Sequence, residues 1–209
     1  MAVCEHGWFS KRFIYEESFQ MPFLVKGPGI KAGKINYDII SNVDFAPTWL
    51  EFAGAAIPSY MQGESFLHTL LGKGPKQSED TVAYHRYWMH RENIHNSYAH
   101  YGIRDKRYKL IFWYNQGLGL PHTKPGGDKR VDDQEWELFD CQEDPMELFN
   151  LWANHEYAEV RERMLRLLEA KILQIGDLPA HPVAFPAEKL VEMYIPGANI
   201  AVRAEQHNL

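Results

Sequence analysis

The stretch that decides the fold is Tyr101-Gly-Ile-Arg-Asp-Lys-Arg-Tyr-Lys-Leu-Ile-Phe-Trp-Tyr114. Aromatic and β-branched residues are frequent in both of its halves, which favours β-strands over residues 101–104 and 108–114. Asp105 and Lys106 stand between the two runs and predict a tight hairpin turn. The stretch therefore predicts two neighbouring antiparallel strands of a small sheet.

Further elements follow on either side of this hairpin. Strand-like runs cover residues 81–88 and 135–140, and the glycine-rich, charged segment over residues 115–133 is interpreted as a long surface loop. From His155 to about Ile175, apolar residues recur at helical spacing opposite a face of Glu and Arg. We expect this long helix to pack across the small sheet.

The N-terminal part of the chain has a different pattern. The apolar run from Met21 to Lys26 predicts a short strand that is buried on both faces. Helices are predicted from Asn42 or Asp44 through Ala53 and from Ser65 to Leu71, and a glycine follows each of them. A stretch rich in Gly and Lys over residues 72–78 reads as a linker to the sheet.

These patterns together predict an α/β protein. Residues 1–72 are expected to form the end of a strand-and-helix domain, and residues 79–176 a subdomain of antiparallel sheet plus helix. Residues 177–209, which contain several prolines, are expected to form an irregular tail. With 45% hydrophobic and 24% charged residues, the 209-residue chain has enough apolar side chains for a real core.

Composition and charge exclude several classes of function. The net charge of −6 leaves no basic surface for a nucleic-acid partner. No run reaches the roughly 18 apolar residues of a membrane span, and the first residues do not resemble a signal peptide, so the compartment stays open. Cys4 and Cys141 lie far apart and outside any Cys-x-x-Cys spacing, which argues against a disulfide framework and a zinc site.

Several ordered blocks carry the signal for function. They are Glu5-His6-Gly7-Trp8-Phe9-Ser10-Lys11-Arg12-Phe13 with Met21-Pro22-Phe23-Leu24-Val25, Asn42-Val43-Asp44-Phe45-Ala46-Pro47-Thr48, Tyr101-Gly102-Ile103-Arg104 with Arg107-Tyr108-Lys109-Leu110-Ile111, and Glu137-Leu138-Phe139-Asp140 with Asp144-Pro145. In this order they resemble the C-terminal portion of the type I sulfatases, and the resemblance runs from Glu5 to about Ile175. Several blocks in the right order are far more specific than one short motif.

The resemblance implies an alkaline-phosphatase-like fold and a formylglycine-dependent hydrolysis of sulfuric esters, with a calcium ion that holds the sulfate group. In that family the nucleophile is a hydrated aldehyde made from Cys or Ser in a Cys/Ser-x-Pro/Ala-x-Arg motif. This sequence contains no such motif and lacks the family's paired N-terminal Asp ligands. We therefore assign no metal ligand here, expect calcium only in the complete family protein, and expect a missing N-terminal segment to complete the pocket.

Two residues of the first block are candidate catalytic residues. A sulfate ester needs cations and hydrogen-bond donors on its non-bridging oxygens, and the resemblance assigns this contact to Lys11. The alternative is an ordinary solvated lysine. His6 can give or take a proton near neutral pH and is the second candidate. Its alternative is a loop histidine held by a backbone carbonyl.

Four histidines occur at positions 85, 90, 95 and 100. We interpret this five-residue spacing as placing no pair on one strand face or one helical turn, which argues against a metal site made by these histidines alone. The resemblance implies instead that the loop before residue 101 reaches the mouth of the pocket. His95 and His100 are therefore the candidates for contact with the alcohol half of the substrate.

The substrate is expected to be a sulfated small molecule or glycan, whose alcohol is an aryl group, a saccharide or choline. Two other hypotheses stay open: a phosphonate or phosphodiester hydrolase on the same fold, and a non-catalytic truncated fragment. For the isolated chain we expect no sulfatase activity and weak calcium affinity. We also expect it to self-associate through apolar surface on the first 70 or so residues.

Overall fold

The computed structural model describes residues 2–3, 9–91, 96–116 and 133–194. The chain forms two compact units, each of which is treated by itself. The first, which we call the sheet unit, comprises Met1–Met21 and Tyr84–Leu209. The second, the helical unit, comprises Pro22–Ala83. Among the described residues, no helix is both long and apolar enough to cross a membrane.

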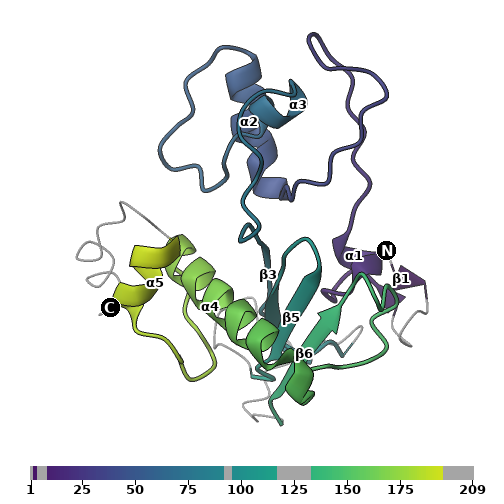
Figure 1. The fold of residues 1–209 in the computed structure, drawn as a ribbon, viewed down its shortest axis with the longest axis vertical. Coiled ribbons are helices and arrows are strands. Elements are labelled where there is room, and N and C mark those ends of the chain that lie inside the picture. The colour runs from purple at the N-terminus through teal and green to yellow at the C-terminus, as the bar shows by residue number, and fades with distance from the viewer. Residues whose placement is uncertain (1, 4–8, 92–95, 117–132, 195–209) are drawn as a thin grey trace. The chain divides into compact units, whose positions relative to one another are not determined.

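The predicted antiparallel sheet is present in the sheet unit (Figure 1). Its four strands are β3 (Ala83–Tyr87), β4 (His100–Arg104), β5 (Tyr108–Trp113) and β6 (Glu135–Asp140), in that spatial order. The hairpin between β4 and β5 is also confirmed, because Arg104 lies opposite Lys109 and the N–H of Asp105 donates to the carbonyl of Tyr108 at 3.0 Å.

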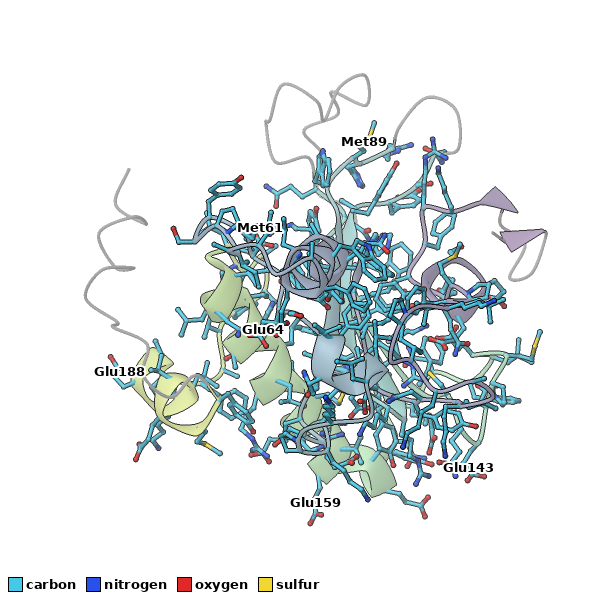
Figure 2. All side chains as sticks on the ribbon, turned by 90° about the horizontal axis from the view of Figure 1, so that it is seen from above. Met61, Glu64, Met89, Glu143, Glu159 and Glu188 are labelled. Atoms are coloured by element: carbon cyan, nitrogen blue, oxygen red, sulfur yellow. The ribbon has the colours of Figure 1, made fainter. Side chains whose placement is uncertain are left out.

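One face of this sheet, the helix face, is covered by α4 (Ala158–Ile175), as predicted (Figure 1). A 3-10 turn, η4 (His155–Tyr157), precedes α4, and Gly176 ends it with a φ of 72°. The apolar stripe of the helix is buried, while Glu159 points away from the molecule (Figure 2). Gly fits this terminal position because L-residues disfavour a left-handed backbone.

The opposite face, the segment face, is covered by the N-terminal segment of the chain. Strands β1 (Ala2–Val3) and β2 (Phe9–Ser10) pair, and α1 (Glu16–Phe19) follows. Phe13, Ile14 and Tyr15 are buried between β2 and α1, against the sheet residues Ile111, Trp113 and Phe139. The first 21 residues therefore belong to the sheet unit, whereas we had predicted a division after residue 72.

A glycine on β4 makes this packing possible. A Cβ at Gly102 would lie 2.3 Å from the carbonyl oxygen of Leu110 and 3.1 Å from Cδ1 of Ile14. A side chain at this position would force β5 or the segment to shift, because packed interiors have no spare volume. The absence of a Cβ on β4 therefore allows the segment to lie directly on the strands.

The tail predicted to be irregular contains a helix. Within its described part, α5 (Ala187–Tyr194) packs on α4 and buries Leu190 and Val191. Pro186 precedes the helix, a position where its missing N–H is not needed. Figure 2 shows Glu188 of α5 pointing outward. The run from Ala187 to Tyr194 is short and amphipathic, and tertiary contact with α4 stabilises it as a helix.

The helical unit contains both predicted helices in shortened form. They are α2 (Phe45–Phe52), which a 3-10 turn η2 (Asn42–Asp44) precedes, and α3 (Leu67–Leu70). The backbone N–H of Ser41 donates to the carboxylate of Asp44 at 2.7 Å and caps the start of this element. Thr48 joins the two helices, since its hydroxyl accepts the N–H of Phe66 at 3.0 Å.

The strand predicted from Met21 to Lys26 is wrong. These residues adopt no regular structure, no described strand pairs with them, and Leu24 is 96% exposed. An apolar run forms a buried strand only where neighbouring strands take up its backbone hydrogen bonds. The run is rich in apolar residues, but pairing partners decide whether such a run becomes a strand.

Candidate functional site

On the segment face, the stretch over residues 11–15, which we call the Lys11 segment, lies next to His100. Lys11 follows β2 directly, and its side chain is exposed. Two residues further on, the buried ring of Phe13 stacks on the imidazole of His100, with 6.2 Å between centroids and 7° between planes. The predicted residues His6 and His95 lie outside the described residues. Two of the four predicted site residues therefore lie in neighbouring parts of one face.

The imidazole of His100 is fully buried in an aromatic surrounding. Its centroid lies 4.4 Å from that of Trp113 and 5.7 Å from that of Tyr87. Nδ1 lies 2.8 Å from the carbonyl oxygen of Tyr98; because a carbonyl only accepts, Nδ1 carries the proton. Burial lowers the pKa of His100 to about 3, so the ring is neutral at physiological pH. Its role in substrate contact stays a prediction.

His85 lies beside His100, with 5.8 Å between the ring centroids. The five-residue spacing was expected to place no pair of these histidines on one strand face, and the two rings indeed belong to different strands. They meet because β3 and β4 are neighbours in the sheet. Burial lowers the pKa of His85 to about 4. Nε2 of each ring is buried, and neither has a hydrogen-bond partner among the described residues.

Other unusual features gather where β4 begins and β5 ends. The hydroxyl of Ser97 and the amide oxygen of Asn115 are buried, and the described residues supply no hydrogen-bond partner for them. Arg91, Asn96 and Asn115 have φ values of 53°, 49° and 48°, which L-residues adopt at an energetic cost. Unsatisfied polar atoms and strained backbone concentrate at functional sites, so this end of the sheet is the candidate site.

A hydrogen-bond network around the carboxylate of Glu137 borders this site. The hydroxyl of Tyr15 donates to both oxygens of Glu137 at 3.2 and 3.1 Å, and Nε1–H of Trp113 donates to one of them at 2.7 Å. Burial raises the pKa of Glu137 above its ordinary value, against the lowering effect of these two donors. Glu137 stands in a block that the sulfatase resemblance contains, yet nothing in the sequence indicated this role.

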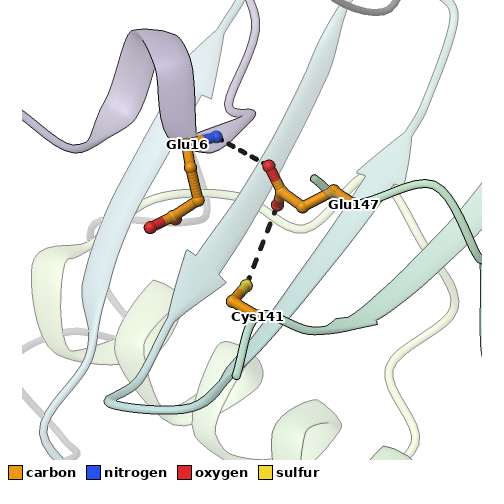
Figure 3. Close-up of side chains that lie close together, drawn as sticks. All are labelled: Glu16, Cys141 and Glu147. Atoms are coloured by element: carbon orange, nitrogen blue, oxygen red, sulfur yellow. Dashed lines mark hydrogen bonds between the residues drawn. The ribbon is translucent and has the colours of Figure 1, made fainter. Parts of the chain in front are cut away.

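A buried lysine joins α1 to the sheet. The ammonium of Lys109 lies 2.8 Å from the carboxylate of Glu16 and 2.6 Å from that of Glu147. Arg104 also binds Glu16, at 3.1 Å. Glu147 accepts the backbone N–H of Glu16 at 2.7 Å and contacts the thiol of Cys141 (Figure 3). These contacts fix the first turn of α1, four residues after Arg12.

The same residues form the only group of possible metal ligands in the described part of the chain. One ligand atom each from Glu16, Cys141 and Glu147 lies within 4.8 Å of the others. Calcium takes six to eight oxygen ligands, whereas this group offers two carboxylates and a thiol whose pKa is raised by burial to about 12. The ammonium of Lys109 already pairs with both carboxylates, and Arg104 pairs with Glu16 as well. The group does not fit calcium.

Comparison with known proteins places the chain in a family. Residues 4–119 match the family model described as N-sulphoglucosamine sulphohydrolase, C-terminal. An N-acetylglucosamine-6-O-sulfatase of Bacteroides thetaiotaomicron is 40% identical over 176 residues, which are 83% of this chain and 28% of that protein. An Ulvan-active sulfatase of Formosa agariphila is 30% identical over 188 residues, with 83% and 37% covered.

Solved structures agree with these relatives. A structure described as a complex with its substrate D-glucosamine-2-N,6-O-disulfate matches with a TM-score of 0.70 and 39% identity, over 82% of this chain and 32% of that one. The chain thus spans about a third of the length of the proteins it matches. It belongs to the type I sulfatases, the sulfuric ester hydrolases of the alkaline-phosphatase-like fold, and corresponds to their C-terminal portion.

Proposed function

We propose that the protein containing this chain hydrolyses sulfuric esters of amino sugars, and that this chain supplies one side of the substrate pocket. The observation that carries the proposal is the 39% identical structure, whose description names D-glucosamine-2-N,6-O-disulfate as substrate. The N-acetylglucosamine-6-O-sulfatase relative supports the same substrate class. Among the alcohols left open by the sequence, a saccharide is therefore favoured over an aryl group and choline.

Lys11 is the residue we propose for contact with the sulfate group. Its side chain is exposed, while its backbone lies two residues from the buried Phe13. An ammonium offers three donors and a compact charge, which stabilise the non-bridging oxygens and the leaving oxygen as the S–O bond breaks. His6 is proposed to line the same pocket and to exchange a proton with the substrate.

We propose that the nucleophile and the calcium ion belong to the complete protein. When bound, calcium would neutralise the sulfate oxygens and so favour attack on sulfur. His95 and His100 are proposed to face the alcohol half of the substrate. For His100 this requires a substrate hydroxyl to donate to the buried Nε2, the atom that its fixed tautomer leaves as an acceptor.

The test is sulfate release from 6-sulfated N-acetylglucosamine by the complete protein. Lys11→Ala is expected to lower kcat/KM by about 100-fold or more, the typical loss of one transition-state donor. Lys26→Ala replaces another exposed lysine and serves as the control. An unchanged rate in Lys11→Ala contradicts the role of this residue.

The alternative hydrolase is tested in the same assay with a phosphonate monoester and a phosphodiester. A phosphonate monoester hydrolase from Silicibacter pomeroyi matches with a TM-score of 0.59 at 20% identity, which shows a shared fold alone. We expect the sulfate ester to be the best substrate. Faster turnover of either phosphorus compound would favour the alternative.

The isolated chain is proposed to be inactive and to self-associate. In the helical unit, large apolar side chains are exposed, among them Leu24, Tyr37, Tyr60 and Ile35. Such surface drives association in water. Sedimentation at several concentrations checks this, and a concentration-independent monomer is the contrary result. Measurable sulfatase turnover by the chain alone would contradict its assignment as a portion of a larger enzyme.

A further inference from the structure

Glu137 is a half-buried carboxylate, and among the described residues it lacks the lysine or arginine partner that several other carboxylates of the sheet unit have. Lys109 binds Glu16 and Glu147, Arg107 binds Asp140 and Arg86 binds Asp177. In the part of the chain that the structure describes, the polar contacts of Glu137 are the two donors Tyr15 and Trp113, and no ion pair reaches it. A buried charge without a counter-ion is unfavourable for stability, which calls for another reason for its presence.

The two donors come from the two parts of the candidate site. Tyr15 belongs to the Lys11 segment, four residues after Lys11. Trp113 belongs to the rings that surround His100 on the sheet, His85, Tyr87 and Trp113, which together with His100 we call the His100 wall. The Trp113 ring contacts both His100 and Phe13, at centroid distances of 4.4 and 6.3 Å. One carboxylate thus accepts hydrogen bonds from both parts.

An ionised carboxylate is chemically suited to accept hydrogen bonds from two donors at once. It accepts at two oxygens and has no donor of its own, so an O–H and an N–H can approach it together. A glutamine would turn an NH2 group toward one of them. Hydrogen bonds to an ionised acceptor are also shorter and stronger than neutral ones, in agreement with the 2.7 Å contact to Trp113.

We propose that Glu137 is a positioning residue that sets the Lys11 segment against the His100 wall through Tyr15 and Trp113. The inference about catalysis rests on the proposed sulfatase function, since only that function gives Lys11 a role. The geometric part, that the carboxylate couples the two donors, is a property of this chain and is testable without substrate.

The test uses amide and indole signals of the isotope-labelled chain. Glu137→Gln is expected to speed amide hydrogen exchange in residues 11–15 by about 5-fold, because a hydrogen bond to a neutral acceptor is weaker by roughly this factor. Exchange in α4, which reports on global unfolding, should stay the same. Glu135→Gln is the matched control, since Glu135 is an exposed carboxylate on the same strand and face.

Coupling is measured at the indole N–H of Trp113. Tyr15→Phe removes only the phenolic O–H and should shift this signal, because the carboxylate then serves a single donor. In the Glu137→Gln background the same substitution should leave the signal in place. If Tyr15→Phe leaves the Trp113 signal unshifted in the otherwise natural chain, or if exchange in α4 rises as much as in residues 11–15, the proposal is wrong.

The outcome is independent of sulfate hydrolysis. If the complete protein fails to hydrolyse sulfate esters while the exchange and coupling results hold, Glu137 positions the segment and only the proposed function fails. If hydrolysis is found, Glu137→Gln should lower kcat by about 10-fold with KM little changed, since a misplaced group loses rate more than binding. A normal kcat in that variant would overturn the catalytic part of the inference.

Discussion

The two faces of the sheet are built in different ways. On the helix face, the buried polar side chains Tyr101, His181 and Glu169 all have hydrogen-bond partners. The Tyr101 hydroxyl bonds Nδ1 of His181, Nε2 of His181 lies near the carboxylate of Glu169, and Glu169 also accepts the backbone N–H of Ala184 at 2.7 Å. On the segment face, His85 and His100 keep unpartnered Nε2 atoms, and Glu137 has no counter-ion in the described part. These helix-face groups thus compensate one another, while the named groups of the segment face lack such partners among the described residues.

The difference teaches where function lies in this chain. Both faces bury aromatic side chains, so burial alone does not distinguish them. Unsatisfied polar atoms are uncommon in folded proteins, and a group of them beside an exposed lysine is the more informative observation. We therefore propose that the segment face is the functional face and that α4, on the opposite side of the sheet, contributes stability.

The largest expected effect is at the ionic anchor of the segment face. Glu147→Ala leaves Lys109 buried with only Glu16 as its partner and should lower the free energy of unfolding by about 3–5 kcal/mol. Glu143→Ala removes a nearby exposed carboxylate and should change it by less than about 0.5 kcal/mol. Urea unfolding of both variants checks this. Equal stability would show that the anchor is dispensable.

Truncating one buried side chain on each face compares their contributions to stability. Leu168→Ala removes a fully buried side chain of α4 and should cost about 2–5 kcal/mol of global stability. Ile14→Ala, on the segment, should cost less, because the segment can detach locally while sheet and α4 stay folded. Amide exchange separates the two: Ile14→Ala should affect residues 11–19 and spare α4. Exchange that rises everywhere in Ile14→Ala would break the distinction.

A smaller effect is expected at Gly102. Gly102→Ala introduces a Cβ that would lie 2.3 Å from the Leu110 carbonyl oxygen, so the strands or the segment must shift. We expect a loss of about 1–3 kcal/mol, the usual range for overpacking. Thermal unfolding measures it, with Gly27→Ala as a control because its Cβ would have 3.3 Å to the nearest atom. A stabilised Gly102→Ala variant would contradict the packing described.

The smallest effect concerns pH. Burial would raise the pKa of Asp177, but hydrogen bonds from Arg86 and Tyr84 outweigh it and lower the pKa below 3.8. Its stabilising contribution is therefore present above the unfolded value and lost as pH falls through the folded one. For Glu137 the pKa is raised above 4.5, so its contribution is present below 4.5 and lost as pH rises through the folded value.

The two groups therefore predict opposite slopes. The stability difference between the natural chain and Asp177→Asn should shrink on acidification. The difference between the natural chain and Glu137→Gln should instead shift in favour of the natural chain as pH falls toward 4.5. Urea titrations at several pH values measure both, and slopes of the same sign would refute the assignment.

The sequence by itself determined the local elements and the family. Strand composition and the Asp105-Lys106 turn predicted the β4–β5 hairpin, and helical periodicity predicted α4. The ordered motif blocks predicted a sulfatase, which the family match confirms, and they singled out Lys11, whose role stays a prediction. All of these signals are carried by residues close together in the sequence.

Only the tertiary structure decided which distant residues meet. It joined Tyr15 to Glu137 across 122 positions, brought His85 beside His100, and left the Met21–Lys26 run without a strand partner. The physical reason is that burial, pairing and charge compensation depend on neighbours in space, which periodicity and turn chemistry do not encode.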